Sequence, residues 1–184
     1  MVMDVGFKEW ALVCEALGDG RQSVILRKGG IAEGRAGFLF KHPEFLLFPT
    51  LFHEQVSKLK LPPDTALPCL PQGEHSIAYR VVVEWTRDLT DWEQVRRLDP
   101  FHLWAEHLIQ ERFVYEGKRS VSLAFVRVYR LVPTFVFPDA PQYGGCRSWV
   151  DLPELPQGTR FVPVLDEEAH RDREAAVLFA LGEI

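Results

Sequence analysis

Alternation of apolar and polar positions marks the strands that this chain is expected to form. In the stretch 76–85, every second residue from Ile77 to Trp85 is apolar, and the row between them holds Arg80 and Glu84. One buried and one partly solvated face is typical of an antiparallel sheet. The stretch 120–132 is apolar on both faces through its middle, which predicts a central strand. Shorter strands are predicted at 23–28, 37–40, 44–48 and 160–165, with 37–40 and 44–48 paired as a hairpin around Lys-His-Pro.

Helical spacing predicts the other elements. Phe7, Trp10, Ala11 and Cys14 recur at intervals of three and four, which predicts a helix over 7–17 that the Gly-Asp-Gly at 18–20 ends. Asp or Thr caps and a proline at the first helical position predict further helices at 89–98, from Asp99 to about 113, and from Asp166 to 181. One or two helical turns are expected in 51–60. The segments 61–75 and 133–158 are rich in proline and turn residues and are expected to be irregular.

The order of these elements predicts the fold class. Strands and helices do not alternate strictly, which argues against a doubly wound parallel sheet. A chain of 184 residues is long enough for one domain with a substantial core, and no linker divides it. We therefore expect a single α+β domain over 1–184, with a curled, mostly antiparallel sheet and flanking helices.

Composition indicates the class of the protein and the compartment in which we expect it. Hydrophobic residues make up 47% and charged residues 26%, as in ordinary globular proteins. The apolar runs are shorter than the ~20 residues that span a bilayer, and the N-terminus lacks the basic and apolar segments of a signal peptide. The three cysteines lie far apart, which argues against disulfides and a cysteine zinc site and fits a reducing compartment. We expect a cytoplasmic protein without membrane contact, bound metal or cofactor.

Charge is distributed unevenly along the chain. The formal net charge is −5, which disfavours general coating of DNA. Segments 27–60 and 110–130 each carry +3, whereas 151–184 carries −5. The two positive segments would form a local basic face if they are neighbours in space.

The stretch Arg-Lys-Gly-Gly-Ile-Ala-Glu-Gly-Arg, at 27–35, combines cations and glycines directly after a predicted strand. Glycines free the backbone to turn its N–H groups towards an anion, and the cations add charge at the same place. The spacing fits neither G-x-x-x-x-G-K-[ST] nor G-x-G-x-x-G, so no named nucleotide motif applies. The alternative is a turn with solvated cations, in which Glu33 pairs with an arginine.

A second glycine stretch, Tyr-Gly-Gly-Cys-Arg-Ser-Trp, spans 143–149. Arg147 beside Cys146 would favour the thiolate, and a nucleophile of this kind with His53 and Glu33 is one interpretation. A second is a glycine turn that leads into an edge strand with Trp149 in the core. A third places Tyr143 and Trp149 against a nucleic-acid base beside basic residues.

Four stretches, at 8–33, 45–55, 127–131 and 143–152, resemble the bacterial family labelled domain of unknown function 1802. The likeness extends over nearly the whole chain. Members fused to restriction-endonuclease-like domains imply a role beside nucleic-acid processing. The pattern of a helix ending in glycine and a strand ending in Leu-Arg-Lys also resembles the opening of PUA-like barrels of the ASCH and EVE type. That resemblance implies an RNA or modified base held at the helix–strand junction.

The favoured hypothesis is a non-catalytic module that binds a nucleic acid or a nucleotide-like anion in a basic cleft formed by the glycine loop. The candidate ligand-binding residues are Arg27, Lys28, Gly29, Gly30, Arg35, Thr50, His53, Tyr143, Arg147 and Trp149. One alternative is a hydrolase that uses His53, Cys146 and an acid such as Glu33. Another is an accessory protein that contacts a nuclease-like partner protein through its acidic C-terminal helix.

Overall fold

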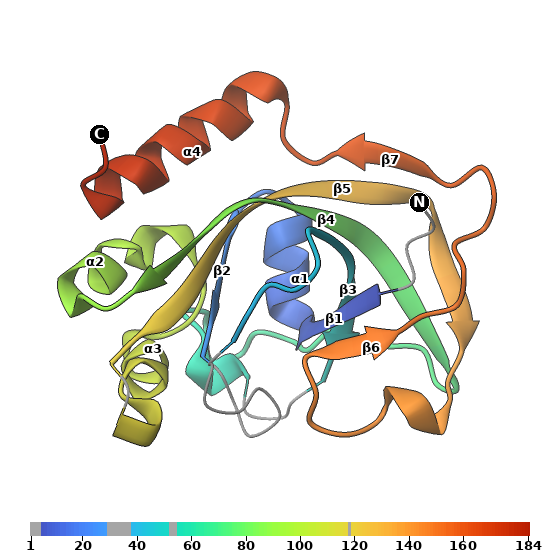
Figure 1. Cartoon of the computed structure of the whole chain (residues 1–184). Helices are drawn as coiled ribbons and strands as arrows, with labels where there is room; N and C mark the ends of the chain where they lie inside the picture. Colours follow the sequence, from blue (N-terminus) through green and yellow to red (C-terminus); the bar gives the residue numbers. More distant parts are fainter. Residues whose placement is uncertain (1–4, 29–37, 52–54, 118) are drawn as a thin grey trace.

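The seven strands of the described residues belong to one curved sheet (Figure 1). The computed structural model describes residues 5–28, 38–51, 55–117 and 119–184. The strand order is β2-β5-β4-β3-β1-β6, and β7 pairs with β5 beside this path. The strands are β1 (Val5–Trp10), β2 (Val24–Arg27), β3 (Glu44–Thr50), β4 (Glu74–Leu89), β5 (Val121–Pro138), β6 (Trp149–Asp151) and β7 (Arg160–Pro163). Among these pairings β1 and β3 run parallel and the others antiparallel, which confirms the predicted α+β class.

Four α-helices accompany the sheet in the described part of the chain. They are α1 (Ala11–Gly18), α2 (Trp92–Arg97), α3 (Glu106–Phe113) and α4 (Glu167–Leu181). Figure 1 shows α1 inside the curve of the sheet and α4 outside it. The predicted caps of two helices are present: the Asp91 side chain accepts a hydrogen bond from Glu93 N, and Asp166 accepts one from Ala169 N. No described helix has the length and apolar character to cross a membrane.

The helix predicted over 7–17 is wrong in its first half, because residues up to Trp10 form β1. Phe7 lies opposite Leu47 of β3 and Trp149 of β6, so its apolar character serves the sheet. The following helix α1 is buried on nearly all sides, and seven of its eight residues are buried. The apolar residues 7, 10, 11 and 14 therefore do not share one helix. Phe7 and Trp10 lie in a strand, and Ala11 and Cys14 lie in the buried helix that follows it.

The hairpin predicted from 37–40 and 44–48 does not form among the described residues, which begin again at Phe38. The segment 38–40 is irregular, and β3 pairs with β1 and β4 instead. Phe38 is apolar because its ring packs on Phe7 and Trp149 in the core.

The turn-rich segment predicted from 133 begins too early, because β5 continues to Pro138. Pro133 has no N–H to donate to a strand ladder. It falls where the pairing of β5 with β4 jumps from Arg130 to Phe135, so the ladder loses no hydrogen bond there.

The helix predicted from Asp99 to 113 is interrupted. A 3₁₀ turn at Asp99–Phe101 ends before α3 begins at Glu106. Between them, Lys60 N donates to Leu103 O and Ala105 N donates to Lys58 O. These contacts to a distant loop replace the helical hydrogen bonds, while Trp104 is fully buried.

Two apolar clusters lie on the two faces of the sheet. Leu47 belongs to the large cluster around α1, and its neighbours Leu46 and Phe48 belong to the second cluster. Alternate residues of a strand point to opposite faces, so these side chains identify the face of each cluster. The second cluster also contains Tyr143 and Val150, whereas Trp149 packs against the first cluster, so the second glycine stretch contributes side chains to both faces.

Candidate functional site

Arg27, the last residue of β2, is engaged by the protein itself. Its guanidinium Nη2 donates to the carbonyl of Lys8 and lies 3.3 Å from Glu9 Oε2. The guanidinium carbon is 4.5 Å from the centre of the Phe7 ring. The Glu9 side chain is 0% exposed and that of Arg27 is 18% exposed. Arg27 therefore holds β1 in place, and its guanidinium binds groups in the protein interior.

A second arginine joins this buried pair. Arg112 of α3 donates from Nη1 to Leu26 O over 3.3 Å, and its guanidinium lies 5.7 Å from the Trp10 ring centre and 5.3 Å from that of Trp104. Burial, and to a smaller degree the charge of Arg27, lower the pKa of Arg112 to about 10. The sequence offers no sign of this group, because Glu9 and Arg112 look like polar positions on solvated helix faces.

Lys28 and Thr50 also contact the backbone. Lys28 Nζ donates to Ser120 O over 2.9 Å and to Phe113 O over 3.4 Å, which ties β2 to the end of α3. Thr50 Oγ1 donates to Glu9 O over 3.0 Å. Lys28 therefore ties β2 to the segment after α3, and Thr50 binds the backbone of Glu9.

The second glycine stretch begins with a buried ring. Tyr143 is 5% exposed and packs against the rings of Phe48, His75 and Phe137. Its ring is part of the core in this structure and offers no open face to a base. After it, Gly145 has a φ of +79°, a left-handed conformation that favours glycine and brings the chain back towards β1.

Lys8 of β1 is fixed on this glycine stretch. Its ammonium donates to Gly144 O over 3.2 Å and to Gly145 O over 3.0 Å, and its backbone N–H donates to Ser148 O. Burial lowers the pKa of Lys8, and the neighbouring guanidinium of Arg147 lowers it further. Two cations, one on β1 and one on the loop, thus lie close together. Sequence reasoning missed Lys8, because its partners lie 136 and 137 residues away.

The cations beside this loop lack acidic partners within the part of the chain that the structure describes. Neither Lys8 nor the exposed Arg147 makes an ion pair there. The backbone N–H groups of Gly145, Cys146 and Arg147 likewise donate to no described acceptor. Two positive side chains and three N–H groups without a described acceptor thus occur at this loop, and groups of these kinds can bind an anion.

Trp149 connects the described ends of the two glycine stretches. Its ring centre is 4.8 Å from that of Phe7, on which Arg27 lies, and 6.1 Å from that of Phe38. His42 meets the same indole edge-on at 4.9 Å. Trp149 is half-buried, and its Nε1 has no hydrogen-bond partner among the described residues. Its packing is that of a core residue with one accessible side.

Several predicted site residues lie outside the described residues: Gly29, Gly30, Glu33, Arg35 and His53. Cys146 lies within the described residues; it is exposed and lies beside Lys8 and Arg147. The hydrolase constellation of Cys146 with His53 and Glu33 stays a prediction. In the described ranges, His, Cys, Asp and Glu side chains form no group of three that would hold a metal ion.

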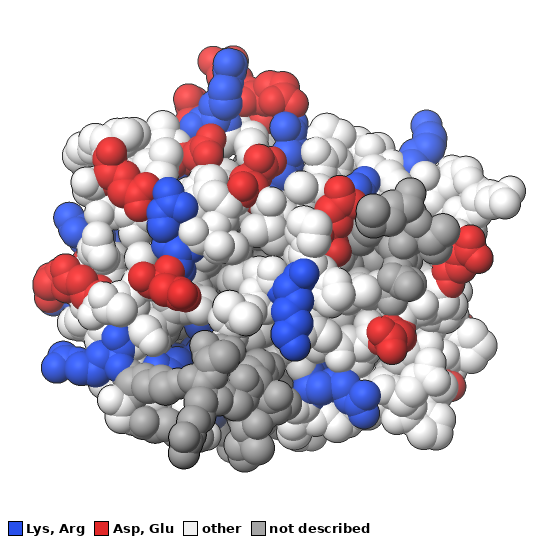
Figure 2. All heavy atoms as spheres, viewed as in Figure 1, with Lys and Arg blue, Asp and Glu red and all other residues white. Residues whose placement is uncertain are grey.

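The surface charges are mixed on the face of the molecule drawn in Figure 2. Figure 2 shows Lys and Arg side chains interspersed with Asp and Glu on the face seen in Figure 1, without an extended area of one sign among the described residues. On this face, attraction of an anion would therefore depend on local groups and not on a broad basic area.

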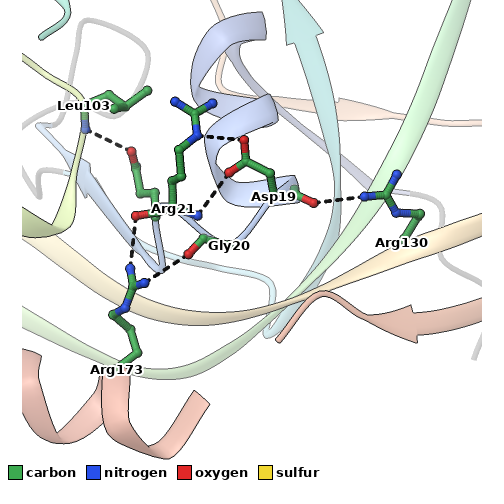
Figure 3. A network of polar contacts seen from close by, with 8 residues as sticks. Asp19, Gly20, Arg21, Leu103, Arg130 and Arg173 are labelled. Carbon is green, nitrogen blue, oxygen red and sulfur yellow. Dashed lines mark hydrogen bonds and ion pairs between the residues drawn. The ribbon is translucent and has the colours of Figure 1, made fainter. Parts of the chain in front are cut away.

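A separate polar network joins α4 to the turn between α1 and β2 (Figure 3). Arg173 of α4 donates to Arg21 O over 3.0 Å and to Gly20 O over 3.1 Å. Arg130 of β5 donates to Gly18 O, and Gln22 accepts a hydrogen bond from Leu103 N. These groups are satisfied within the chain, so the network holds elements together.

Comparisons with known proteins place the chain in a family. The family described as "Domain of unknown function (DUF1802)" matches residues 6–176. No curated protein sequence matches the chain. Among solved structures it is similar to the ASCH protein of Zymomonas mobilis, with 12% identity, a TM-score of 0.43 and coverage of 94% of this chain and 93% of that chain. A serine-to-alanine mutant of the Zymomonas protein matches with 12% identity, a TM-score of 0.45 and coverage of 93% and 94%. Because the family match spans most of its length, the chain belongs to the DUF1802 family of domains of unknown function.

Proposed function

We propose that the protein is a binding module for a nucleic acid or nucleotide-like ligand, and that it holds a phosphate group at Lys8 and Arg147. One observation carries the proposal. The Lys8 ammonium is fixed on the carbonyls of Gly144 and Gly145, next to the exposed Arg147, without a described carboxylate to pair with either cation.

Physical chemistry supports an anion at this position. Two neighbouring cations repel each other, and a bound phosphate would relieve that repulsion. An ammonium has three donors, and two of them serve the glycine carbonyls, so one remains for a ligand. Arg147 adds a planar donor group that matches phosphate oxygens, and the loop N–H groups complete the set.

The first glycine stretch has a supporting role in this proposal. Arg27 holds the carbonyl of Lys8 and the carboxylate of Glu9, and so positions β1 beneath the phosphate site. Gly29, Gly30 and Arg35 remain predicted ligand-binding residues. Trp149 remains a predicted base-contacting residue, and its ring packs on Phe7 in the cluster around α1.

Binding of fluorescent single-stranded RNA and DNA, followed by anisotropy, tests the proposal. We expect Arg147→Ala and Lys8→Ala each to weaken binding by about tenfold, since each removes a charge-assisted phosphate contact. Arg160→Ala on β7 removes an exposed cation elsewhere and serves as the matched control. Equal affinities of wild type, Arg147→Ala and Arg160→Ala would contradict the site.

A further inference from the structure

A hollow of about 300 Å³ lies between α1, β3, β4 and the proline-rich loop. This volume is at the lower end of the range of small-molecule sites. Its walls are mainly apolar and come from four parts of the chain, including Ala11, Leu47, Pro49, Leu70, Pro71 and Ala78. Prolines have fixed φ angles, so this part of the wall is conformationally restricted before any ligand enters.

A few polar groups border the hollow, and most are uncharged. Burial raises the pKa values of the Cys14 thiol and the Tyr79 phenol, so both are protonated at neutral pH. The hydroxyls of Tyr79 and Ser76 make no hydrogen bond to the described residues. Glu15, which also lines the hollow, is exposed and adds a negative charge at its edge.

The ring of Tyr79 is held in place by its contact with α1. A Cβ atom built at Gly18 would overlap this ring, so the absence of a side chain at Gly18 lets the phenol lie against the helix. The Arg130 guanidinium lies 5.6 Å from the centre of the same ring. The hollow therefore has a preformed aromatic wall.

The hollow and the proposed phosphate site lie on opposite faces of the sheet. Lys8 pairs with Phe48 of β3, and its ammonium is 5.9 Å from the Phe48 ring centre. Leu47 and Pro49, the residues on either side, line the hollow. Successive residues of a strand point to opposite faces, so the two sites are separate and the inference does not rest on the phosphate site.

We propose that this hollow binds a small uncharged ring compound that carries an N–H donor. Flat rings are complementary to proline and leucine walls and to the edge of Tyr79. The N–H group would donate to the Glu15 carboxylate or to one of the two free hydroxyls. The same carboxylate repels anions, so the hollow should favour uncharged ligands, whereas the phosphate site favours anions.

Titration of the ¹⁵N-labelled full chain with indole, and separately with benzoate, tests the proposal. We expect saturable amide shifts for indole in α1, in β3 around Leu47 and in the loop around Leu70, and affinity for benzoate about tenfold weaker. Shifts scattered over the surface, or equal affinity for the two probes, would overturn it.

Two further measurements localise the binding. Ala78→Phe fills the hollow and should abolish the indole shifts, whereas Val136→Phe on the exposed side of β5 should not change them. Retained binding in Ala78→Phe would overturn the proposal.

If Ala78→Phe does not fold, the rate of alkylation of Cys69 tests the proposal instead. Cys69 lines the hollow, and in Cys146→Ser it is the remaining exposed thiol, because Cys14 is buried. Saturating indole should slow alkylation of Cys69 by iodoacetamide severalfold. An unchanged rate would contradict a ligand in this hollow.

Discussion

At the scale of single residues, the most consequential feature is a carboxylate that water does not reach. Glu9 accepts a hydrogen bond from Trp10 N and pairs with Arg27, and its side chain is 0% exposed. A buried charge without its partner is costly, because it loses hydration without compensation. The pair therefore couples β1 to β2 through its two side chains.

Neutralising Glu9 is expected to destabilise the fold. Glu9→Gln keeps the size of the side chain but leaves the Arg27 charge without a buried partner, which should cost about 3 kcal/mol of unfolding free energy. Urea denaturation measures the change, with Glu154→Gln on an exposed loop as control. A loss as small as that of the control would show that the pair contributes little.

His102 gives the fold a pH dependence of predictable sign. Burial, with a smaller effect of the Lys60 ammonium, lowers the pKa of His102 from 6.5 to about 3. The unfolded chain takes up this proton near pH 6.5 and the folded chain only near pH 3. The contribution of neutral His102 to the unfolding free energy is therefore complete above pH 6.5 and is lost as the pH falls towards 3.

Lowering the pH from 7.5 to 5 should cost about 2 kcal/mol through His102. Other groups titrate in this range, among them His170, whose pKa burial also lowers. The comparison is therefore with His102→Phe, whose unfolding free energy should fall by about 2 kcal/mol less over the same interval. Identical pH profiles of wild type and variant would refute a buried, neutral His102.

At the scale of elements, α4 is held on the sheet by both apolar and polar contacts. Val177 and Leu181 are buried, and Arg173 reaches the carbonyls of Gly20 and Arg21 (Figure 3). Phe179 on the same helix is 74% exposed, so a limited part of the apolar surface of α4 is buried. The hydrogen bonds of Arg173 are thus among several polar contacts that orient the helix, together with those of Trp85 to Glu174 and of Gln94 to Leu181 O.

Removal of this tether should loosen α4 before it affects the sheet. Arg173→Ala should cost about 1–2 kcal/mol and should speed amide hydrogen exchange in α4 more than in β4 and β5. Arg171→Ala is the matched control, because Arg171 donates only within its own helix among the described residues. Equal exchange in the two variants would show that Arg173 does not hold the helix.

Local patterns predicted some elements well and misread others for identifiable reasons. Alternation over 76–85 and the cap at Asp166 act within one element, so β4 and α4 were predictable. Residues 103–105 leave helical geometry because their backbone pairs with residues 58–60, a contact that no local pattern encodes. The boundary between β1 and α1 was hidden because both elements are rich in buried apolar residues.

At the scale of the whole molecule, the curved sheet separates two sites. Pairing of β1 with β6 brings the glycine stretch after Tyr143 to Lys8 on one face. Packing of α1 against β3 and β4 leaves the hollow on the other face. The sequence pointed to Arg147, but its approach to Lys8 depends on a pairing between distant strands, which no local pattern encodes.

The salt dependence of nucleic-acid binding tests the central claim most directly. The slope of log affinity against log salt counts phosphate contacts, at about 0.7 per phosphate for single strands. We expect the slope for single-stranded RNA to fall by about 0.7 in Arg147→Ala, with the Arg160→Ala control unchanged. An unchanged slope in Arg147→Ala, or no salt-dependent binding by the wild-type chain, would contradict a phosphate site at Lys8 and Arg147.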